Sequence, residues 1–527
     1  MTAKHGNATI SAGGRGLPAI NQQTISSDSS LAASRPPARS ELFGAGVAIA
    51  LAAFYFVTSL YIAKHRLFWF DEILTVRIAG LPDLATIWDS LAHGADGTPP
   101  GYYLLARLSE KLLGSSEVAA RLSSALAMTA TLLITFDCAR RLTDALHGLI
   151  ALAMLSCSML PYYGYEARSY AIYSMLAALS LWLWTRFPDR RRWPTVAFGG
   201  VLFVAITMHY YAVLLLVPYG LWELLRWRRG QRPSPKLIGG IVGVLLAAGV
   251  LASLMLSYSQ QFVGAFSSTP WKPSLPTLRA VWGELLPDGL FLLALMMVWI
   301  VLARTIRRDD RDEESLPSAT AAESVGWLFL SIPLAGFVVA EWVTHAFLPR
   351  YFIAMLPGVA VGLSCCLWRN FRQIRGVSLG IFLLFAMFGL VQQTSAARHP
   401  EQVGPYDQQG KIRHYLALES ALHNEGKKYL VFSSSIMHLE FVQYAQAPND
   451  SVLLLASDPS HRNMQNAMEL NFARHYPLTT LEIYEVEQHA AQVALIEPRE
   501  DFLQELKRDG YKPVVRFPGP LEIVYLQ

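Results

Sequence analysis

Two adjacent carboxylates, Asp71 and Glu72, directly follow the aromatic run Phe68–Phe70. A carboxylate can take the proton from an incoming hydroxyl group, so this pair is a candidate for acid–base chemistry. Aromatic side chains favour the headgroup level of a bilayer. The sequence therefore predicts that the two carboxylates form a site at a membrane surface.

Further ionisable and aromatic residues occur later in the chain and are candidates for the same site. They are Asp96, Tyr102, Tyr103, Arg121, Glu166, Arg168, His209, Tyr210, Arg350 and Tyr351. Arginine offers a planar fork of donors for phosphate oxygens. Carboxylates and guanidinium groups that converge at headgroup level suit a reaction on a lipid phosphate. Each residue also has a simpler interpretation, because a single arginine at the end of a span is commonly a snorkelling anchor.

The composition of the chain indicates a membrane protein. Of its 527 residues, 53% are hydrophobic and only 16% are charged, whereas soluble domains carry about 25% charged residues. Apolar runs recur from Phe43 to Gln393. The net charge of +4 gives no reason to expect binding to nucleic acid. The four cysteines lie in or beside apolar runs, where packing is the expected role.

The apolar runs predict about eleven membrane-spanning helices, because a span needs about 20 mostly apolar residues. The predicted spans are 43–63, 117–137, 147–164, 168–186, 194–209, 210–226, 237–257, 285–304, 325–344, 351–368 and 376–393. Arginine-rich connections alternate with connections that carry few basic residues, and the positive-inside rule then places the N-terminus in the cytoplasm. An odd number of spans places the C-terminus outside. All the candidate site residues then lie on the outer face.

The expected fold is a polytopic α-helical membrane protein with a small α/β domain at its C-terminus. Residues 1–42 read as a disordered cytoplasmic tail and residues 43–393 as the transmembrane domain. The first outer loop, 64–117, contains two apolar helical stretches that are too short to span and suit the membrane interface. Residues 394–527 alternate strand-like and helical runs, which predicts an α/β domain in the periplasm.

Four motifs in this order resemble those of the GT-C glycosyltransferases related to protein O-mannosyltransferases and lipid A aminoarabinose transferases. They are WFDEILTVRIAG (69–80), GTPPGYYLLARLSEKLLGSSEVAARLSSALA (97–127), YEARSYAIYSMLAALSLWLW (165–184) and LPRYFIAMLP (348–357). The resemblance covers roughly residues 43–393. Thr98, Gly101 and Ser123 depart from the usual pattern of the family. These departures bear on contacts to the acceptor more than on the type of reaction.

The resemblance implies an inverting transfer of a sugar from a polyprenyl-phosphate donor to a glycan, glycolipid or protein acceptor on the periplasmic face of a bacterial inner membrane. Asp71, with Glu72 beside it, becomes the candidate catalytic carboxylate. The candidates for binding the donor phosphate are Arg121, Arg168 and Arg350. No cofactor is required, although Asp71, Glu72 and Asp96 could hold a divalent cation through oxygen atoms. Nothing in the sequence indicates an oligomeric state.

Two other classes of function stay open at this point. A transporter or lipid flippase would place ionisable residues near the bilayer midplane and show internal repeats with broken helices. No such repeat is visible, and the charged candidates lie at the ends of spans. A non-catalytic partner in polysaccharide assembly would instead use its outer domain for binding.

Overall fold

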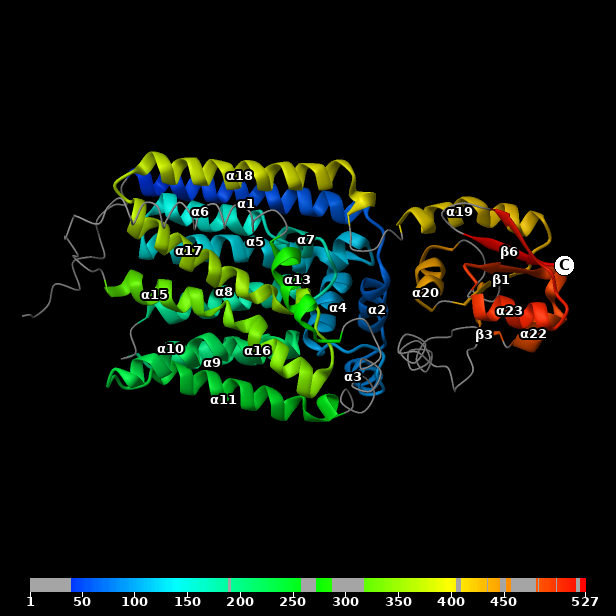
Figure 1. Ribbon diagram of the computed structural model, residues 1–527, viewed down its shortest axis with the longest axis horizontal. Coiled ribbons are helices and arrows are strands. Elements are labelled where there is room, and N and C mark those ends of the chain that lie inside the picture. The colour runs from blue at the N-terminus through cyan, green and yellow to red at the C-terminus, as the bar shows by residue number, and fades with distance from the viewer. Residues whose placement is uncertain are drawn as a thin grey trace, which may run out of the picture.

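The computed structural model divides into a bundle of helices and a smaller α/β part at one end of it (Figure 1). It describes residues 39–187, 191–256, 272–286, 317–403, 409–433, 435–445, 452–455, 480–481, 483–498, 500–517 and 522–527. The bundle contains α1 (Arg39–His65), α5 (Glu117–Leu142), α6 (Ala145–Ser156), α7 (Leu160–Gly164), α8 (Tyr170–Arg186), α9 (Trp193–Met208), η1 (Tyr210–Leu215), α10 (Leu216–Arg228), α11 (Pro235–Val250), α13 (Leu275–Leu285), α15 (Pro317–Leu328), α16 (Ser331–Val339), η2 (Ala340–Thr344), η3 (Pro349–Met355), α17 (Leu356–Phe371) and α18 (Arg375–Arg398).

Several of these helices have the length and composition of membrane spans. Five described helices are long and apolar enough to cross a bilayer, and three more apolar helices have 10 to 17 residues. The long ones are Arg39–His65, Glu117–Leu142, Ala321–Thr344, Pro349–Phe371 and Arg375–Arg398. Their outward sides expose large apolar residues such as Phe43, Leu383 and Val391, as expected for surfaces that face lipid.

The predicted spans coincide with helices wherever the structure describes them, with differences at their ends. The first helix begins at Arg39, within the predicted tail 1–42. The predicted span 147–164 is divided by a short break at 157–159 between α6 and α7. The predicted span 285–304 lies almost wholly outside the described residues. The number of eleven spans stays a prediction.

The first loop folds into three helices across one end of the bundle. They are α2 (Phe70–Ala79), α3 (Leu84–Ala92) and α4 (Gly101–Leu113). Helices α3 and α4 match the two predicted apolar stretches, whereas α2, which carries Asp71 and Glu72, was not predicted as a helix. Figure 1 shows α2 running across the end of the bundle and facing the α/β part.

The C-terminal part is a mixed six-stranded sheet with helices on both faces. Its elements are η4 (Pro400–Gln402), α19 (Gln409–Asn424), β1 (Tyr429–Phe432), α20 (Ser435–Tyr444), β2 (Val452–Leu455), β3 (Thr480–Leu481), α22 (Ile483–Gln488), η6 (Ala490–Gln492), β4 (Val493–Ile496), α23 (Glu500–Arg508), β5 (Pro513–Phe517) and β6 (Ile523–Leu526). The strand order is β3-β2-β1-β4-β6-β5, in which β1 to β4 are parallel and β6 is antiparallel to both of its neighbours.

Side chains along each strand point alternately to the two faces of the sheet, which explains why a layer of helices covers each face. Leu430 and Phe432 of β1 pack in one apolar cluster with residues of α19 and α20. Val431, between them, packs in a second cluster with residues of α22 and α23. Successive strand residues point to opposite faces, so a strand that is apolar throughout needs cover on both sides.

Glycines set the distance between α9 and α11. Gly239 and Gly243 of α11 lie against the backbone of α9, and a methyl group added at Gly243 would collide with the carbonyl of Gly199. Small residues four apart allow membrane helices to approach closely, which strengthens their van der Waals contact. This contact fixes the distance between the first half of α9 and α11.

We expect Gly243→Ala to destabilise the protein by about 1–3 kcal/mol, because the methyl group forces the two helices apart. The midpoint of thermal unfolding in detergent measures the loss. Gly249→Ala, in the same helix but with open space around it, is the matched control and should leave the midpoint unchanged. Equal midpoints for the two variants would contradict the close approach.

Candidate functional site

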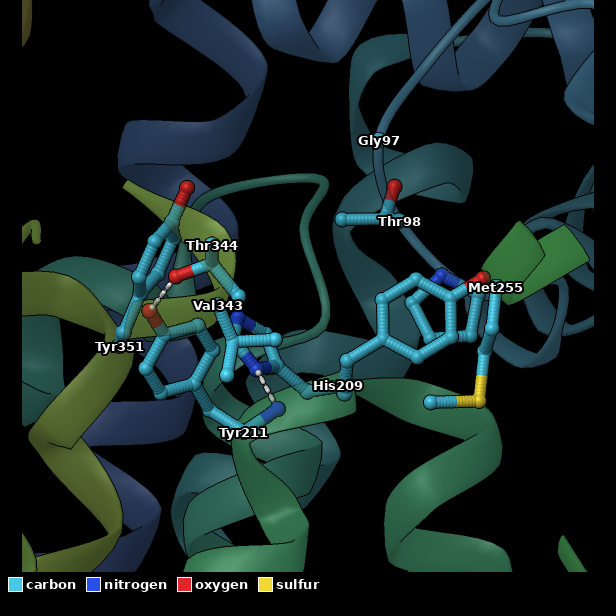
Figure 2. A pocket seen from close by; sticks show the side chains of 10 residues that line it. Gly97, Thr98, His209, Tyr211, Met255, Val343, Thr344 and Tyr351 are labelled. Carbon is cyan, nitrogen blue, oxygen red and sulfur yellow. Dashed lines mark hydrogen bonds between the residues drawn. The ribbon is translucent and has the colours of Figure 1, made fainter. Parts of the chain in front are cut away.

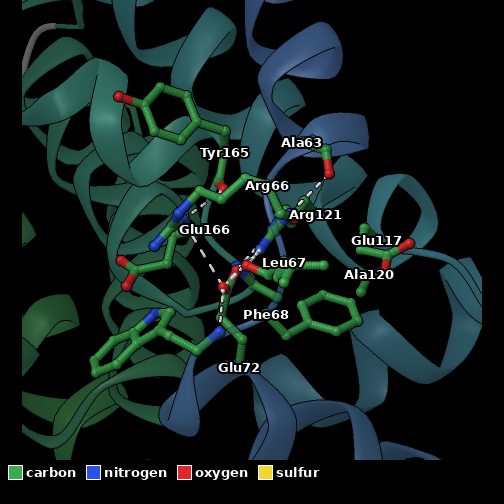
Figure 3. A network of polar contacts seen from close by, with 12 residues as sticks. Ala63, Arg66, Leu67, Phe68, Glu72, Glu117, Ala120, Arg121, Tyr165 and Glu166 are labelled. Atoms are coloured by element: carbon green, nitrogen blue, oxygen red, sulfur yellow. Dashed lines mark hydrogen bonds and ion pairs between the residues drawn. The ribbon is translucent and has the colours of Figure 1, made fainter. Parts of the chain in front are cut away.

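Glu72 and Arg121 form a fully buried ion pair beneath the first loop (Figure 3). Arg121 donates from Nε to Oε1 and from Nη2 to Oε2 of Glu72, each over 2.7 Å. The backbone amide of Ala167 also donates to Oε1 over 2.6 Å. Burial by itself would raise the pKa of Glu72, but the charges of Arg121 and Arg66, together with the hydrogen bonds from Arg121 and Ala167, outweigh it and keep the pKa below its ordinary value.

Arg121 uses all of its donors within the protein. Besides the two bonds to Glu72, its guanidinium group donates to the carbonyls of Ala63, Arg66 and Leu67 over 2.7, 2.7 and 3.0 Å. A guanidinium group has five N–H donors. None is left for a phosphate oxygen, so the geometry does not fit the predicted role of Arg121 in donor binding. The residue instead ties the end of α1 to the start of α2.

Asp71, one residue earlier, points toward two other arginines. Its Oδ2 atom lies 3.4 Å from Nη2 of Arg350 and 3.8 Å from Nη2 of Arg168. This buried oxygen has no hydrogen-bond partner. The carboxylate is thus held electrostatically between two positive charges, and its oxygen can still accept a proton.

A second carboxylate, Asp96, fixes the position of Arg168. Its Oδ2 atom accepts hydrogen bonds from Arg168 Nη1 over 2.6 Å and from Tyr103 over 2.6 Å. Thr98 donates to the same oxygen over 3.0 Å. Burial would raise the pKa of Asp96, yet the Arg168 charge holds it below its ordinary value. Asp96 is therefore a buried anion that orients the guanidinium group.

Arg350 differs from Arg168 and Arg121 because its donors are not taken up. Its guanidinium group makes no hydrogen bond within the described part of the chain, and its buried Nε atom has no partner. It lies 5.6 Å from the ring centroid of Trp69 and 5.8 Å from that of Tyr170, which hold it by cation–π contact. An anion that reached Arg350 would therefore meet several available donors.

An open cavity lies beside this group (Figure 2). Its lining includes the three predicted residues His209, Tyr210 and Tyr351. Thr98 also lines it, and the same hydroxyl group contacts Asp96. His209 stacks on Tyr173 with ring centroids 5.2 Å apart, and its Nδ1 atom accepts from the amide of Tyr211 over 3.3 Å. The cavity is mainly aromatic and apolar, with polar groups on the side of Asp96.

The structure separates two other predicted residues from the cavity. Tyr102 bonds to Ser124 over 2.8 Å and to the carbonyl of Ala120 over 3.2 Å, so it packs α4 against α5. Glu166 is buried, and its Oε2 atom has no hydrogen-bond partner. Its burial, together with the negative charge of Glu72, raises the pKa of Glu166 to about 7.

The predicted cation alternative on Asp71, Glu72 and Asp96 does not match the geometry. Both oxygens of Glu72 are bound to Arg121, and Arg168 contacts both Asp71 and Asp96. Among the described residues, no group of three or more His, Cys, Asp or Glu side chains has the arrangement of a metal site. The three carboxylates therefore do not converge on one cation position.

Sequence reasoning missed two residues that contribute to the site. Arg66 is buried beside Glu72, 3.8 Å from Oε2, and donates to the Tyr162 hydroxyl over 3.2 Å. Its place just before the aromatic run could have indicated it. Glu440, in the α/β part, accepts a hydrogen bond from the amide of Phe70 over 3.0 Å. No signal in the sequence pointed to Glu440.

We expect the protein to lose stability as pH rises from about 4.5 to 7, in part through Glu166. The folded state binds this proton more tightly than the unfolded state, so the contribution is complete below the unfolded pKa and is lost as pH rises through the folded pKa. The shift corresponds to about 3 kcal/mol. In Glu166→Gln the side chain is neutral at every pH, so the unfolding midpoint should fall less between pH 5 and pH 8 than in the wild type.

Glu505→Gln, on an exposed surface of α23, is the control and should follow the wild-type pH profile. Parallel profiles for Glu166→Gln and the wild type would show that Glu166 does not carry this dependence.

Comparison with known proteins finds one matching family model and several similar solved structures. The family described as dolichyl-phosphate-mannose-protein mannosyltransferase matches residues 97–252. No curated protein matches the chain. The crystal structure of ArnT from Cupriavidus metallidurans bound to undecaprenyl phosphate is similar, with a TM-score of 0.55 and 13% identity over 91% of this chain and 98% of that chain. Its apo state gives a TM-score of 0.56 and 13% identity over 91% of this chain and 97% of that chain.

A third structure, the oligosaccharyltransferase of Archaeoglobus fulgidus in complex with Zn and sulfate, has a TM-score of 0.39 and 12% identity over 74% of this chain and 61% of that chain. This likeness is too low to bear on the site. The structural similarity to ArnT extends over nearly the whole of both chains. It therefore includes the segment that matches the family model. Residues 97–252 thus match this family model, and the chain as a whole has the fold of the ArnT structures.

Proposed function

We propose that this protein transfers a sugar, with inversion, from a polyprenyl-phosphate donor to an acceptor hydroxyl group on the periplasmic face of a bacterial inner membrane. The observation that carries the proposal is the placement of Asp71 between Arg168 and Arg350, with its Oδ2 atom free of hydrogen bonds. A base and a phosphate-binding pair are thereby brought within one site. The similarity to ArnT bound to undecaprenyl phosphate supports a lipid-phosphate donor.

The chemistry requires one displacement at the anomeric carbon of the sugar. Asp71 takes the proton of the acceptor hydroxyl as its oxygen forms the new bond to that carbon. The bond from the carbon to the phosphate oxygen breaks, and the electron pair leaves with the polyprenyl phosphate. Arg168 and Arg350 stabilise the negative charge that develops on the departing phosphate. A single displacement inverts the configuration of the sugar.

The surroundings of the site suit such a donor. Residues Gly97–Pro99, His209, Tyr210 and Tyr351 line the adjoining cavity, which offers apolar and aromatic surface to a sugar or a lipid tail. Asp96 keeps Arg168 charged and oriented, so little reorganisation is needed when a phosphate arrives. Glu72 and Arg121, in this proposal, position the loop and do not touch the substrate.

We expect Asp71→Asn to lower the transfer rate by about 10²–10⁴-fold, the usual contribution of a positioned general base. Asparagine has the same shape but cannot take the proton. Transfer of labelled sugar from its polyprenyl-phosphate carrier by purified protein measures the rate. The unfolding midpoint and donor binding should be retained, and normal turnover by this variant would exclude Asp71 as the base.

Arg350→Gln should weaken binding of undecaprenyl phosphate by about ten- to hundredfold, because a hydrogen bond to a charged group is lost. Its unfolding midpoint should stay close to that of the wild type, since Arg350 makes no hydrogen bond within the described chain. Arg121→Gln is the contrasting variant. It leaves Glu72 buried without its partner and should destabilise the fold by about 3–5 kcal/mol. Isothermal titration calorimetry and thermal unfolding separate the two effects.

Unchanged affinity in Arg350→Gln would remove Arg350 from the donor site. If the Arg121→Gln protein folds but binds the polyprenyl-phosphate donor more weakly, Arg121 would instead be assigned to the phosphate-binding site. Helix α2, which carries Asp71, runs across the loop end of the bundle (Figure 1), and Arg350 and Arg168 lie 3.4 and 3.8 Å from the Asp71 carboxylate. This placement favours transfer at the membrane surface over passage across the bilayer.

A further inference from the structure

The α/β part contacts the helix that carries Asp71 through one face of α20. Glu440 Oε1 accepts from the amide of Phe70 over 3.0 Å, and the Tyr444 hydroxyl accepts from the amide of Phe68 over 2.7 Å. Gln443 Oε1 accepts from Arg77 Nε over 3.3 Å. Residues three and four apart on a helix lie on one face, so Glu440 and Gln443 reach α2 from the same side as Tyr444 reaches the segment just before it.

The first turn of α2 is capped only in part by its own sequence. The Glu72 side chain accepts from the amide of Trp69 over 3.3 Å, whereas the amide of Phe70 needs an acceptor from elsewhere. The opening N–H groups of a helix have no partner within the helix, and Ser, Thr, Asp or Asn at the preceding position usually accepts from them. Here that position is Trp69, whose indole ring has no acceptor atom. Glu440 bonds to the amide of Phe70, the first residue of the helix. The acceptor for this amide is therefore provided by the α/β part of the chain.

This bond acts directly on the backbone around Asp71. The amide that Glu440 accepts from belongs to the residue immediately before Asp71. On the bundle side, Arg168 Nη1 donates to the carbonyl of Asp71 over 3.3 Å. The backbone of the proposed base is thus held from the α/β part and from the bundle at once.

We propose that Glu440 is a positioning residue for Asp71, so that the C-terminal domain completes the active site by holding the first turn of α2. This inference rests on the proposed function, in which Asp71 is the base. The C-terminal domain, which no sequence motif explained, then acts in the reaction although it touches neither substrate. Loss of the cap lets the first turn of α2 fray and moves Asp71 away from the acceptor oxygen.

The environment of Glu440 shows why a neutral acceptor is sufficient. The side chain is buried. Burial raises its pKa to about 8, and repulsion from Asp71 adds to the effect. Near neutral pH the group is mostly protonated, so its carbonyl oxygen accepts from Phe70 without placing a second negative charge beside Asp71. Glutamine offers the same acceptor, and we expect it to replace Glu440.

The test compares full-length Glu440→Ala and Glu440→Gln proteins in detergent, with exposed Glu505→Ala as the matched control. In Glu440→Ala, kcat for sugar transfer should fall at least about tenfold, because a buried N–H group loses its partner, while KM for the donor stays within about twofold. Hydrogen–deuterium exchange of the segment 68–78 should rise by about tenfold. Glu440→Gln and Glu505→Ala should match the wild type in both measurements.

Wild-type kcat and exchange in Glu440→Ala would overturn the proposal, as would a Glu440→Gln protein that fails like Glu440→Ala. If Glu440→Ala does not fold, Glu440→Asp, which is one methylene shorter, should show partial loss of both protection and kcat, and wild-type behaviour in that variant would again overturn the proposal. If the wild-type protein transfers no sugar, the proposed function fails, and the exchange measurement alone still decides whether Glu440 holds the turn.

Discussion

The buried ion pair of Glu72 and Arg121 is the interaction on which the arrangement of the first loop across the end of the bundle depends. It joins α2 to α5, and the remaining donors of Arg121 bind the carbonyls at the end of α1. Removing a charge from water is costly unless its partners are well placed. Here every N–H donor of Arg121 is bonded to Glu72 or to a backbone carbonyl. The cost of burying the two charges is therefore offset only when the loop has the arrangement that places these acceptors around Arg121. The pair thereby specifies where α2 lies.

Once α2 is fixed, the geometry of the remaining charges follows. Asp71 faces Arg168 and Arg350, and Asp96 with Tyr103 and Thr98 orients Arg168. The three arginines of the predicted phosphate site thus divide into different environments. All the N–H donors of Arg121 are bonded within the protein, whereas those of Arg168 are bonded only in part. The donors of Arg350 make no hydrogen bond within the described chain. The availability of donors, and not the presence of a charge, distinguishes a binding residue from a structural one.

Much of the fold could be predicted from the sequence because membrane-spanning helices are recognised by their long runs of apolar residues. Backbone groups in lipid must be paired within the segment, so long apolar runs such as 43–63 and 376–393 have little alternative to a helix. Helix α2 was not predicted because its sequence, FDEILTVRIA, has no apolar stripe and is preceded by Trp69, which is not one of the residues that usually cap a helix. Its helical state depends on Glu440 from a distant domain and on Arg121 from α5. Such contacts over hundreds of residues leave no periodic signal.

For the site, the sequence by itself determined the membrane setting, the superfamily resemblance and the set of candidate residues, because apolar runs and short motifs are local properties of the chain. It could not determine which member of the Asp71–Glu72 pair is available for chemistry. Neighbouring residues on a helix point about 100° apart, so Glu72 and Asp71 cannot both face the same partners. Only the tertiary structure decided that Glu72 meets Arg121 and that Asp71 lies beside Arg168 and Arg350. The physical reason is that the available donors lie on segments far apart in the chain, which only the packing of the helices brings together.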